Sequence, residues 1–154
     1  QTTGATEIAW NLDTSPYNTS TGSGSSEPLS SFDSKTTGLL LYSGFGTSTI
    51  PSTSDGSTTT VIDGIEVKIL SDKEARIKDT IIQLAQSGSV IGSNKANTDA
   101  GNNYTYGGST DTWGTSLTYN DLSGLQVALK YSSGTIPHKD SVYVYSVQLK
   151  IYYT

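Results

Sequence analysis

The sequence contains no cysteine, and only 15% of its residues are charged. Without cysteine, the chain can form no disulfide, no thiolate metal site and no cysteine nucleophile. No stretch approaches the ~18 consecutive apolar residues that a membrane-spanning helix requires. The polar surface must therefore come from Ser, Thr, Asn and Gln, a composition that favours a virion or extracellular location.

The balance of charge argues against two classes of partner. The net charge is −5, and the nine Lys and Arg residues are scattered along the chain. Binding to nucleic acid or to an anionic membrane surface requires clustered basic residues, so neither is expected. A length of 154 residues fits one domain with a core of its own.

Residues suited to catalysis or metal binding are sparse. His138 is the only histidine, and with Asp140 it lies in a Gly/Pro loop, where it is expected to face solvent rather than to join a hydrolytic triad. Loop residues such as Asp99, Asn120 and Asp121 could offer oxygen ligands, but their spacing matches no calcium loop. We therefore expect a protein that is not an enzyme and has no cofactor and no metal.

The N-terminal quarter separates from the rest by composition. Residues 6–12, with Ile8, Trp10 and Leu12, alternate weakly and predict an arm strand. Residues 13–34 are rich in Ser, Thr and Gly and predict a flexible linker. The expected organisation is therefore an arm and linker over 1–34 and a β-sandwich domain over 35–154.

Several later segments alternate as strands do. In residues 61–70, Ile65, Val67 and Ile69 should share the buried face. Residues 141–153 predict the longest strand, with one face directed to the core, and the other strands are predicted at 38–46, 113–119 and 125–131. The core face expected for the longest strand comprises Tyr143, Tyr145, Val147, Leu149, Ile151 and Tyr153.

Residues 71–86 carry two conflicting patterns. Ser71 and Glu74 form a possible helix capping box, and Ile77, Ile81 and Leu84 fall at helical spacing. Against a helix, Thr80, Ile81 and Ile82 are β-branched and every neighbouring segment reads as strand. The residues alone leave both possibilities open.

The stretch Thr105-Tyr-Gly-Gly-Ser-Thr-Asp-Thr-Trp-Gly114 organises the sequence. Its glycines predict a tightly folded connection, because glycine adopts the positive φ angles that other residues resist. The segment could close one end of a sandwich with Trp113 in the core. Alternatively, Tyr104, Tyr106, Asp111 and Trp113 could form a binding surface.

From Leu39 to its end, the chain resembles a β-sandwich domain that recurs in virion structural proteins of tailed bacteriophages and prophages. The resemblance rests on Ser43-Gly-Phe-Gly46, Ile62-Asp-Gly-Ile-Glu-Val67, Asn94-Lys-Ala96 and the Thr105–Gly114 stretch. It implies a structural or host-recognition module and a strand over 77–84. The sequence therefore predicts an all-β chain, a single antiparallel, jelly-roll-like sandwich with an N-terminal arm strand.

Two functions follow as hypotheses. The first is a structural subunit that joins copies of itself or other virion proteins, with Ile8, Trp10 and Leu12 in an exchanged strand. The second is a carbohydrate-binding or host-recognition module, in which Tyr104, Tyr106 and Trp113 stack on surface glycans.

Overall fold

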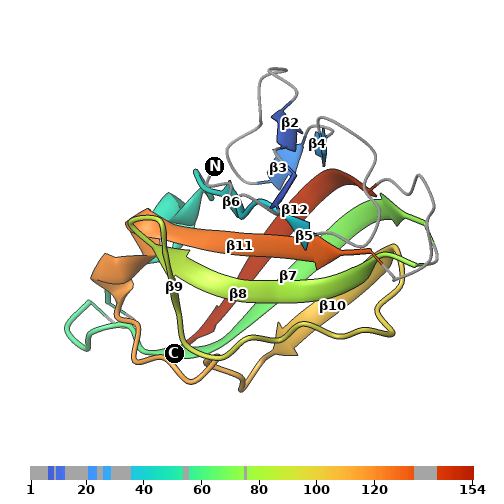
Figure 1. The fold of residues 1–154 in the computed structure, drawn as a ribbon. Helices are drawn as coiled ribbons and strands as arrows, with labels where there is room; N and C mark the ends of the chain where they lie inside the picture. Colours follow the sequence, from blue (N-terminus) through green and yellow to red (C-terminus); the bar gives the residue numbers. More distant parts are fainter. Residues whose placement is uncertain are drawn as a thin grey trace.

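The computed structural model describes residues 36–53, 56–74, 76–133 and 142–154, and the backbone of four short strands nearer the N-terminus. Its strands form two main sheets, and Figure 1 shows β8 and β11 of one sheet in front of β7 and β12 of the other. Apart from the parallel pair β1 and β5, the strand pairs are antiparallel. The predicted all-β class and antiparallel sandwich are confirmed.

The first sheet has the order β1-β5-β11-β8-β9, and β6 also pairs with β11. Its strands are β1 (Glu7–Ile8), β5 (Thr36–Thr37), β6 (Leu40–Tyr42), β8 (Lys78–Gln86), β9 (Ser89–Ile91) and β11 (Leu125–Ser132). The second sheet has the order β10-β7-β12-β3, with β3 (Thr21–Ser23), β7 (Ile62–Lys73), β10 (Asn103–Gly108) and β12 (Val142–Tyr153).

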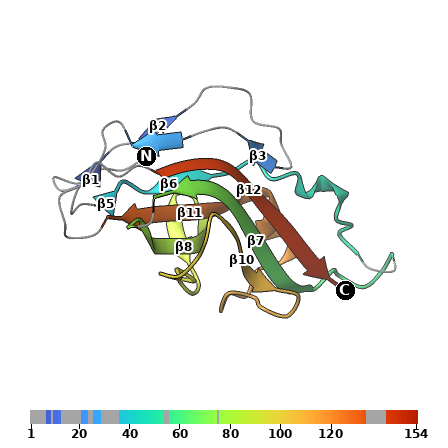
Figure 2. The same ribbon diagram turned by 90° about the vertical axis from the view of Figure 1, so that its right-hand side faces the viewer.

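Three smaller elements complete the fold. A separate pair of strands, β2 (Trp10–Leu12) and β4 (Ser26–Pro28), lies above the sheets in Figure 2. Two 3₁₀ helices, η1 (Thr47–Thr49) and η2 (Tyr119–Gly124), join strands at the ends of the sandwich. No helix in the described part of the chain is long and apolar enough to cross a bilayer.

The core lies between the facing sheets. On β7, Ile65, Val67 and Ile69 are buried, as their alternation predicts. They belong to one apolar cluster with Leu84 on β8 and Leu129 on β11. The ambiguous stretch 71–86 is the end of β7, a turn and β8, so the strand interpretation of residues 77–84 is confirmed.

The predicted core face of β12 is wrong in its first half and at Tyr153, which is 41% exposed beyond a second register shift, between Tyr152 and Tyr153. Val142 and Val144 are buried, whereas Tyr145 is 39% exposed. The cause is a bulge: Val144 lies opposite Ser71 and Ser146 opposite the adjacent Leu70, so Tyr145 has no opposite residue on β7. One extra residue reverses which side chains point inward.

Two further strand predictions need correction. Residues 103–108 of the Gly-rich stretch are strand β10, paired with β7. The strand predicted for 113–119 is absent, and only Thr118 makes an isolated bridge, to Val61. Trp113 and Gly114 have successive φ angles of 58° and 67°, which turn the chain away from an extended path.

The N-terminal strand also differs from its prediction. Residues 7–12 contribute to two short strands, β1 and β2, which pair with β5 and β4 of the same chain. Strands β3 and β4 lie within the range predicted as linker, and β3 pairs with β12. The N-terminal segment therefore makes backbone pairings with both main sheets.

The bulge in β12 yields a direct test. We expect Val144→Asp to destabilise the fold by several kcal/mol or to prevent folding, because it places an unpaired carboxylate in the core. Tyr145→Asp, one residue further on, should change the free energy of unfolding by no more than about 1 kcal/mol. Urea unfolding of both variants would contradict the bulge if Tyr145→Asp were the more damaging change.

Candidate functional site

Trp113 is fastened inside the sandwich by its side chain and its backbone. The residue is fully buried, and its indole Nε1 donates a hydrogen bond of 2.8 Å to the carbonyl oxygen of Ile65 on β7. Its backbone oxygen accepts from the N–H of Ser93 at 2.6 Å, and its own N–H donates to Asp111 Oδ1 at 2.8 Å. The prediction that Trp113 belongs to the core is therefore confirmed.

Two glycines allow this loop to press against the rest of the protein. A Cβ atom on Gly107 would lie 2.5 Å from Trp113 Nε1 and 2.2 Å from the carbonyl oxygen of Ile65. A Cβ atom on Gly92 would lie 2.3 Å from the carbonyl oxygen of Trp113. Both glycines also have positive φ angles. A side chain at either position would therefore clash with these atoms and also strain the backbone.

Asp111 links the loop to the segment that follows β9. Its Oδ2 accepts a hydrogen bond of 2.7 Å from Lys95 Nζ, and the two side chains are 34% and 30% exposed. The bond from Lys95 holds the pKa of the Asp111 carboxyl below its usual value, with a further contribution from the N–H of Trp113. Asp111 therefore has a structural role, fixing the backbone that precedes Trp113.

The aromatic binding surface predicted from the sequence is not present in this arrangement. Tyr106 is 4% exposed, and its hydroxyl donates to Asp79 Oδ2 inside the protein. Tyr104 is half-buried, packs against Tyr106 with ring centroids 4.9 Å apart, and accepts from Asn97 Nδ2. With the rings of Tyr106 and Trp113 buried, a flat platform for a sugar is missing.

The other sequence candidates lie at the limits of the described residues or beyond them. Ile8, Trp10 and Leu12 are described only by their places in β1 and β2. His138 and Asp140 lie outside the described residues. Within the described ranges, no three His, Cys, Asp or Glu side chains gather to hold a metal ion.

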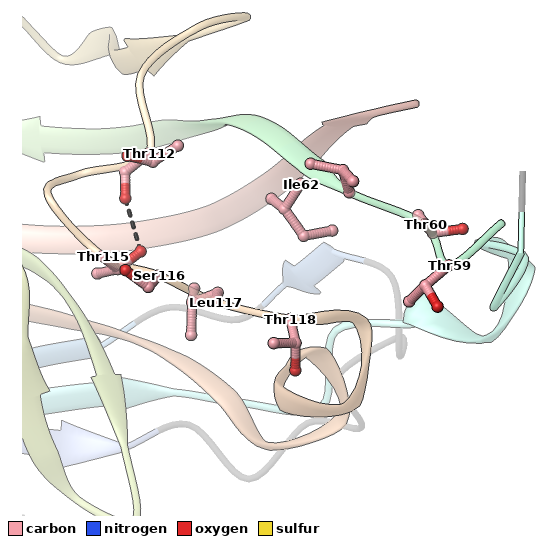
Figure 3. Close-up of a pocket in the computed structure, with 9 residues that line it drawn as sticks. Thr59, Thr60, Ile62, Thr112, Thr115, Ser116, Leu117 and Thr118 are labelled. Carbon is pink, nitrogen blue, oxygen red and sulfur yellow. Dashed lines mark hydrogen bonds between the residues drawn. The ribbon is translucent and has the colours of Figure 1, made fainter.

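A cleft of about 400 Å³ lies beside the Trp113 loop, between residues 59–62 and 112–118 (Figure 3). Its wall carries many hydroxyls, but that of Thr115 donates to the Thr112 oxygen and that of Thr60 to the Pro51 oxygen. No charged side chain lines the cleft. The cleft could hold a neutral group, but its lining offers no acid, base or activated nucleophile.

Among the described residues, the outer edge of β12 is paired for only part of its length. Strand β3 pairs with Ser146–Gln148, and no other described strand pairs with this edge. Ile65 uses its N–H and C=O on the side away from β12, where they bond Asp111 and Trp113. Its antiparallel partner Ile151 must therefore point its own N–H and C=O outward, as must Leu149 two residues earlier.

A groove of about 280 Å³ runs beside this open edge. It is lined on one side by residues 149–151 and Tyr153 of β12, and on the other by residues 45–47, 49 and 50 around η1. Leu149 and Ile151 are half-buried, while Tyr153 is 41% exposed. The edge thus offers outward backbone groups next to a partly apolar hollow.

The sequence contains one weak signal for this edge, because Lys150 is the single charged residue in 141–153 and edge strands are usually protected by charges. The alternation of residues 141–153 indicates a long strand but not which strands flank it. Comparison of the chain with protein-family models, with curated proteins and with solved structures found no match.

Replacing Trp113 tests its structural role. We expect Trp113→Ala to lower the free energy of unfolding by about 3–5 kcal/mol, because it removes a large buried side chain and leaves the Ile65 oxygen without its donor. Val90→Ala, at a side chain that is 42% exposed, should change it by about 0.5 kcal/mol or less. Equal unfolding midpoints in urea for the two variants would contradict the anchor.

The Asp111–Lys95 pair should contribute to stability in a pH-dependent way. Because the folded-state pKa of Asp111 is lowered, its contribution is present above the ordinary value of 3.8 and is lost as the pH falls through the folded-state pKa. We expect Asp111→Asn to cost about 1 kcal/mol or less at pH 7, since the pair is a third exposed, and to cost less at pH ~2 than at pH 7. Urea unfolding of Asp111→Asn, Lys95→Met and the double variant at both pH values gives the interaction free energy between the two side chains.

Proposed function

We propose that this chain is a non-enzymatic structural subunit of a virion or extracellular assembly, whose copies join by strand exchange. The observation that carries the proposal is the outer edge of β12 from Leu149 to Tyr153, with which no described strand pairs. An exposed strand edge recruits another strand, because its N–H and C=O groups are otherwise satisfied only by water. The donor is the N-terminal segment 6–12 of the next copy.

The donor segment is held weakly within its own chain. Strand β1 pairs with β5 over two residues, Glu7 with Thr36 and Ile8 with Thr37, and the pairing is parallel. Strand β2 forms three pairs with β4 in a sheet of only two strands. Such short ladders have little independent stability. The pairings within the chain therefore compete only weakly with pairing to a neighbouring copy.

The groove beside the edge supports the same proposal. A strand added along Leu149–Ile151 would place alternate side chains over the hollow between β12 and η1. Ile8, Trp10 and Leu12 are spaced two apart, so all three would face one side of the added strand. Their burial would contribute on the order of 5 kcal/mol before the entropy of ordering is subtracted.

Exchange of this kind is heterologous, because the donor and acceptor surfaces differ. The result is a closed ring if the rotation between copies closes, and an open filament if it does not. In an open filament, the copy at one end keeps a free acceptor edge and the copy at the other end keeps a free donor segment. The two ends of a filament are therefore expected to differ.

Deletion of residues 1–12 tests the proposal. We expect the shortened chain to fold and to remain a monomer, while the full chain forms rings or filaments. Light scattering after size exclusion and electron microscopy measure the two states. A full chain that stays monomeric at all concentrations, or a shortened chain that unfolds and aggregates, would show that residues 6–12 serve their own domain.

A pair of proline substitutions tests the acceptor edge. Ile151→Pro removes an outward N–H and no bond to β7, so we expect a folded monomer that accepts no donor strand. Lys150→Pro removes an N–H that points toward β7, because Lys150 alternates with Ile151, and should destabilise the fold itself. Normal assembly of Ile151→Pro would contradict the choice of edge.

A further inference from the structure

A lysine and an aspartate meet in the interior where the chain passes from one sheet to the other. Lys73 is the last residue of β7, and Asp79 lies near the start of β8. Lys73 Nζ is 2.9 Å from Asp79 Oδ1, and the side chains are only 5% and 0% exposed. The pair therefore bridges the two sheets of the sandwich within its interior.

The two carboxylate oxygens of Asp79 have different surroundings. Oδ1 contacts the Lys73 amine, whereas Oδ2 accepts a hydrogen bond from the Tyr106 hydroxyl and a long one, 3.5 Å, from the N–H of Asn97. Burial, followed by the bond to Asp79, raises the pKa of Tyr106 well above its ordinary value, so the phenol remains a donor. Oδ2 thus lies where a developing oxyanion would be stabilised.

The amine is held as firmly as the carboxylate. Lys73 Nζ also donates to the carbonyl oxygen of Ala100 at 3.0 Å and lies 5.6 Å from the centre of the Tyr131 ring. The Tyr131 side chain is fully buried. A primary amine is therefore held beside a carboxyl group, with its approach fixed by a carbonyl and an aromatic ring.

We propose that Lys73 and Asp79 condense into an intramolecular isopeptide bond. The ammonium first passes a proton to Oδ1, leaving a neutral amine and a neutral carboxylic acid. The amine lone pair then attacks Cγ, and the electron pair of the C–Oδ2 bond moves onto Oδ2, beside Tyr106. A second proton passes from nitrogen to the Oδ1 hydroxyl, which leaves as water while the C=O bond to Oδ2 forms again.

The atoms balance without a further reactant. The ammonium and carboxylate yield one secondary amide and one water, and the water carries two of the three ammonium hydrogens. A hollow of about 330 Å³ that is lined by Lys73, Ala100 and Asn102 gives the released water a path to solvent. No oxidant, reductant or activated carrier is required.

Burial and proximity favour the amide. Two opposite charges in a protein interior carry a large desolvation cost, which a neutral amide between the same atoms avoids. Because the two reacting groups are held together, they need not meet by diffusion. In well-oriented intramolecular reactions this advantage corresponds to effective molarities of about 10⁵–10⁸ M. The low exposure of both side chains, 5% and 0%, limits the access of water for the reverse hydrolysis.

The mass of the purified full-length chain tests the proposal. We expect an intact mass lower by one water than the sequence predicts. Digestion with trypsin should yield residues 69–76 joined to residues 79–95, because a Lys73 acylated on Nζ is no longer cleaved. A chain of full mass in which trypsin cleaves after Lys73 would overturn the proposal.

Two variants separate this bond from other losses of water. Asp55-Gly56 and Asp63-Gly64 can lose water by forming a cyclic imide, and that loss would persist in Lys73→Arg, which keeps the charge but cannot form the amide. We expect Lys73→Arg to show the full mass. Tyr106→Phe keeps the buried ring and removes the donor to Oδ2, so the linked fraction should form at least about 10-fold more slowly.

If Lys73→Arg fails to fold, the peptide map of the unaltered chain remains decisive, because it locates the link without any substitution. A linked peptide elsewhere, or a water loss confined to residues 55–64, would also overturn the assignment. Equal rates of linkage in the Tyr106→Phe and unaltered chains would remove Tyr106 from the reaction.

Discussion

The hydrogen bond from the Trp113 indole to the Ile65 carbonyl is the interaction on which this end of the sandwich depends. It joins the loop after β10 to the centre of β7, and it holds Trp113 at a φ of 58°, which costs a residue with a side chain roughly 1–2 kcal/mol. Burial of the ring, worth about 5 kcal/mol by area, more than offsets that cost. The loop geometry is therefore a consequence of packing rather than of local preference.

The same anchor occupies the backbone groups of Ile65 on one side of β7. The N–H and C=O of Ile65 bond the loop on the β10 side, so they make no hydrogen bond to Ile151, the residue opposite on β12. The backbone groups of Ile151, and those of Leu149 two residues earlier, therefore point away from β7. Trp113 thus contacts the residue of β7 whose partner on β12, Ile151, directs its backbone groups outward.

Much of the fold could be predicted from the sequence where alternation is regular. Ile65, Val67 and Ile69 face the core because nothing interrupts β7 there. The residues alone left the segment 77–84 open between helix and strand, because helical spacing and β-branched side chains occur together in it. Prediction failed where a single residue interrupts the alternation. The bulge at Tyr145 reverses which side chains of the first half of β12 face the core, and the positive φ of Trp113 prevents the strand predicted to begin there. Such changes depend on contacts with distant residues.

The candidate sites were less predictable because pairing between distant segments creates them. Lys73 and Asp79 are close in sequence, but only the turn between sheets and the approach of Tyr106 from β10 bury them together. The edge of β12 likewise depends on strand pairing, since the described part of β3 reaches no further than Gln148. In both cases the residue types are ordinary, and their surroundings supply the chemistry.

The two proposals meet in β7. A strand bound at Leu149–Ile151 would transmit force to β12. Strand β12 pairs with β7 from Val142 to Tyr153, so a force along the strands would be shared by many hydrogen bonds between them. The far end of β7 is Lys73, where an amide to Asp79 would carry the force into β8 and the other sheet. Without that bond, the two sheets are joined at this point by a short turn and an ion pair. A covalent bridge at the end of the strand that receives the load is therefore placed where an assembly subunit would benefit most from it.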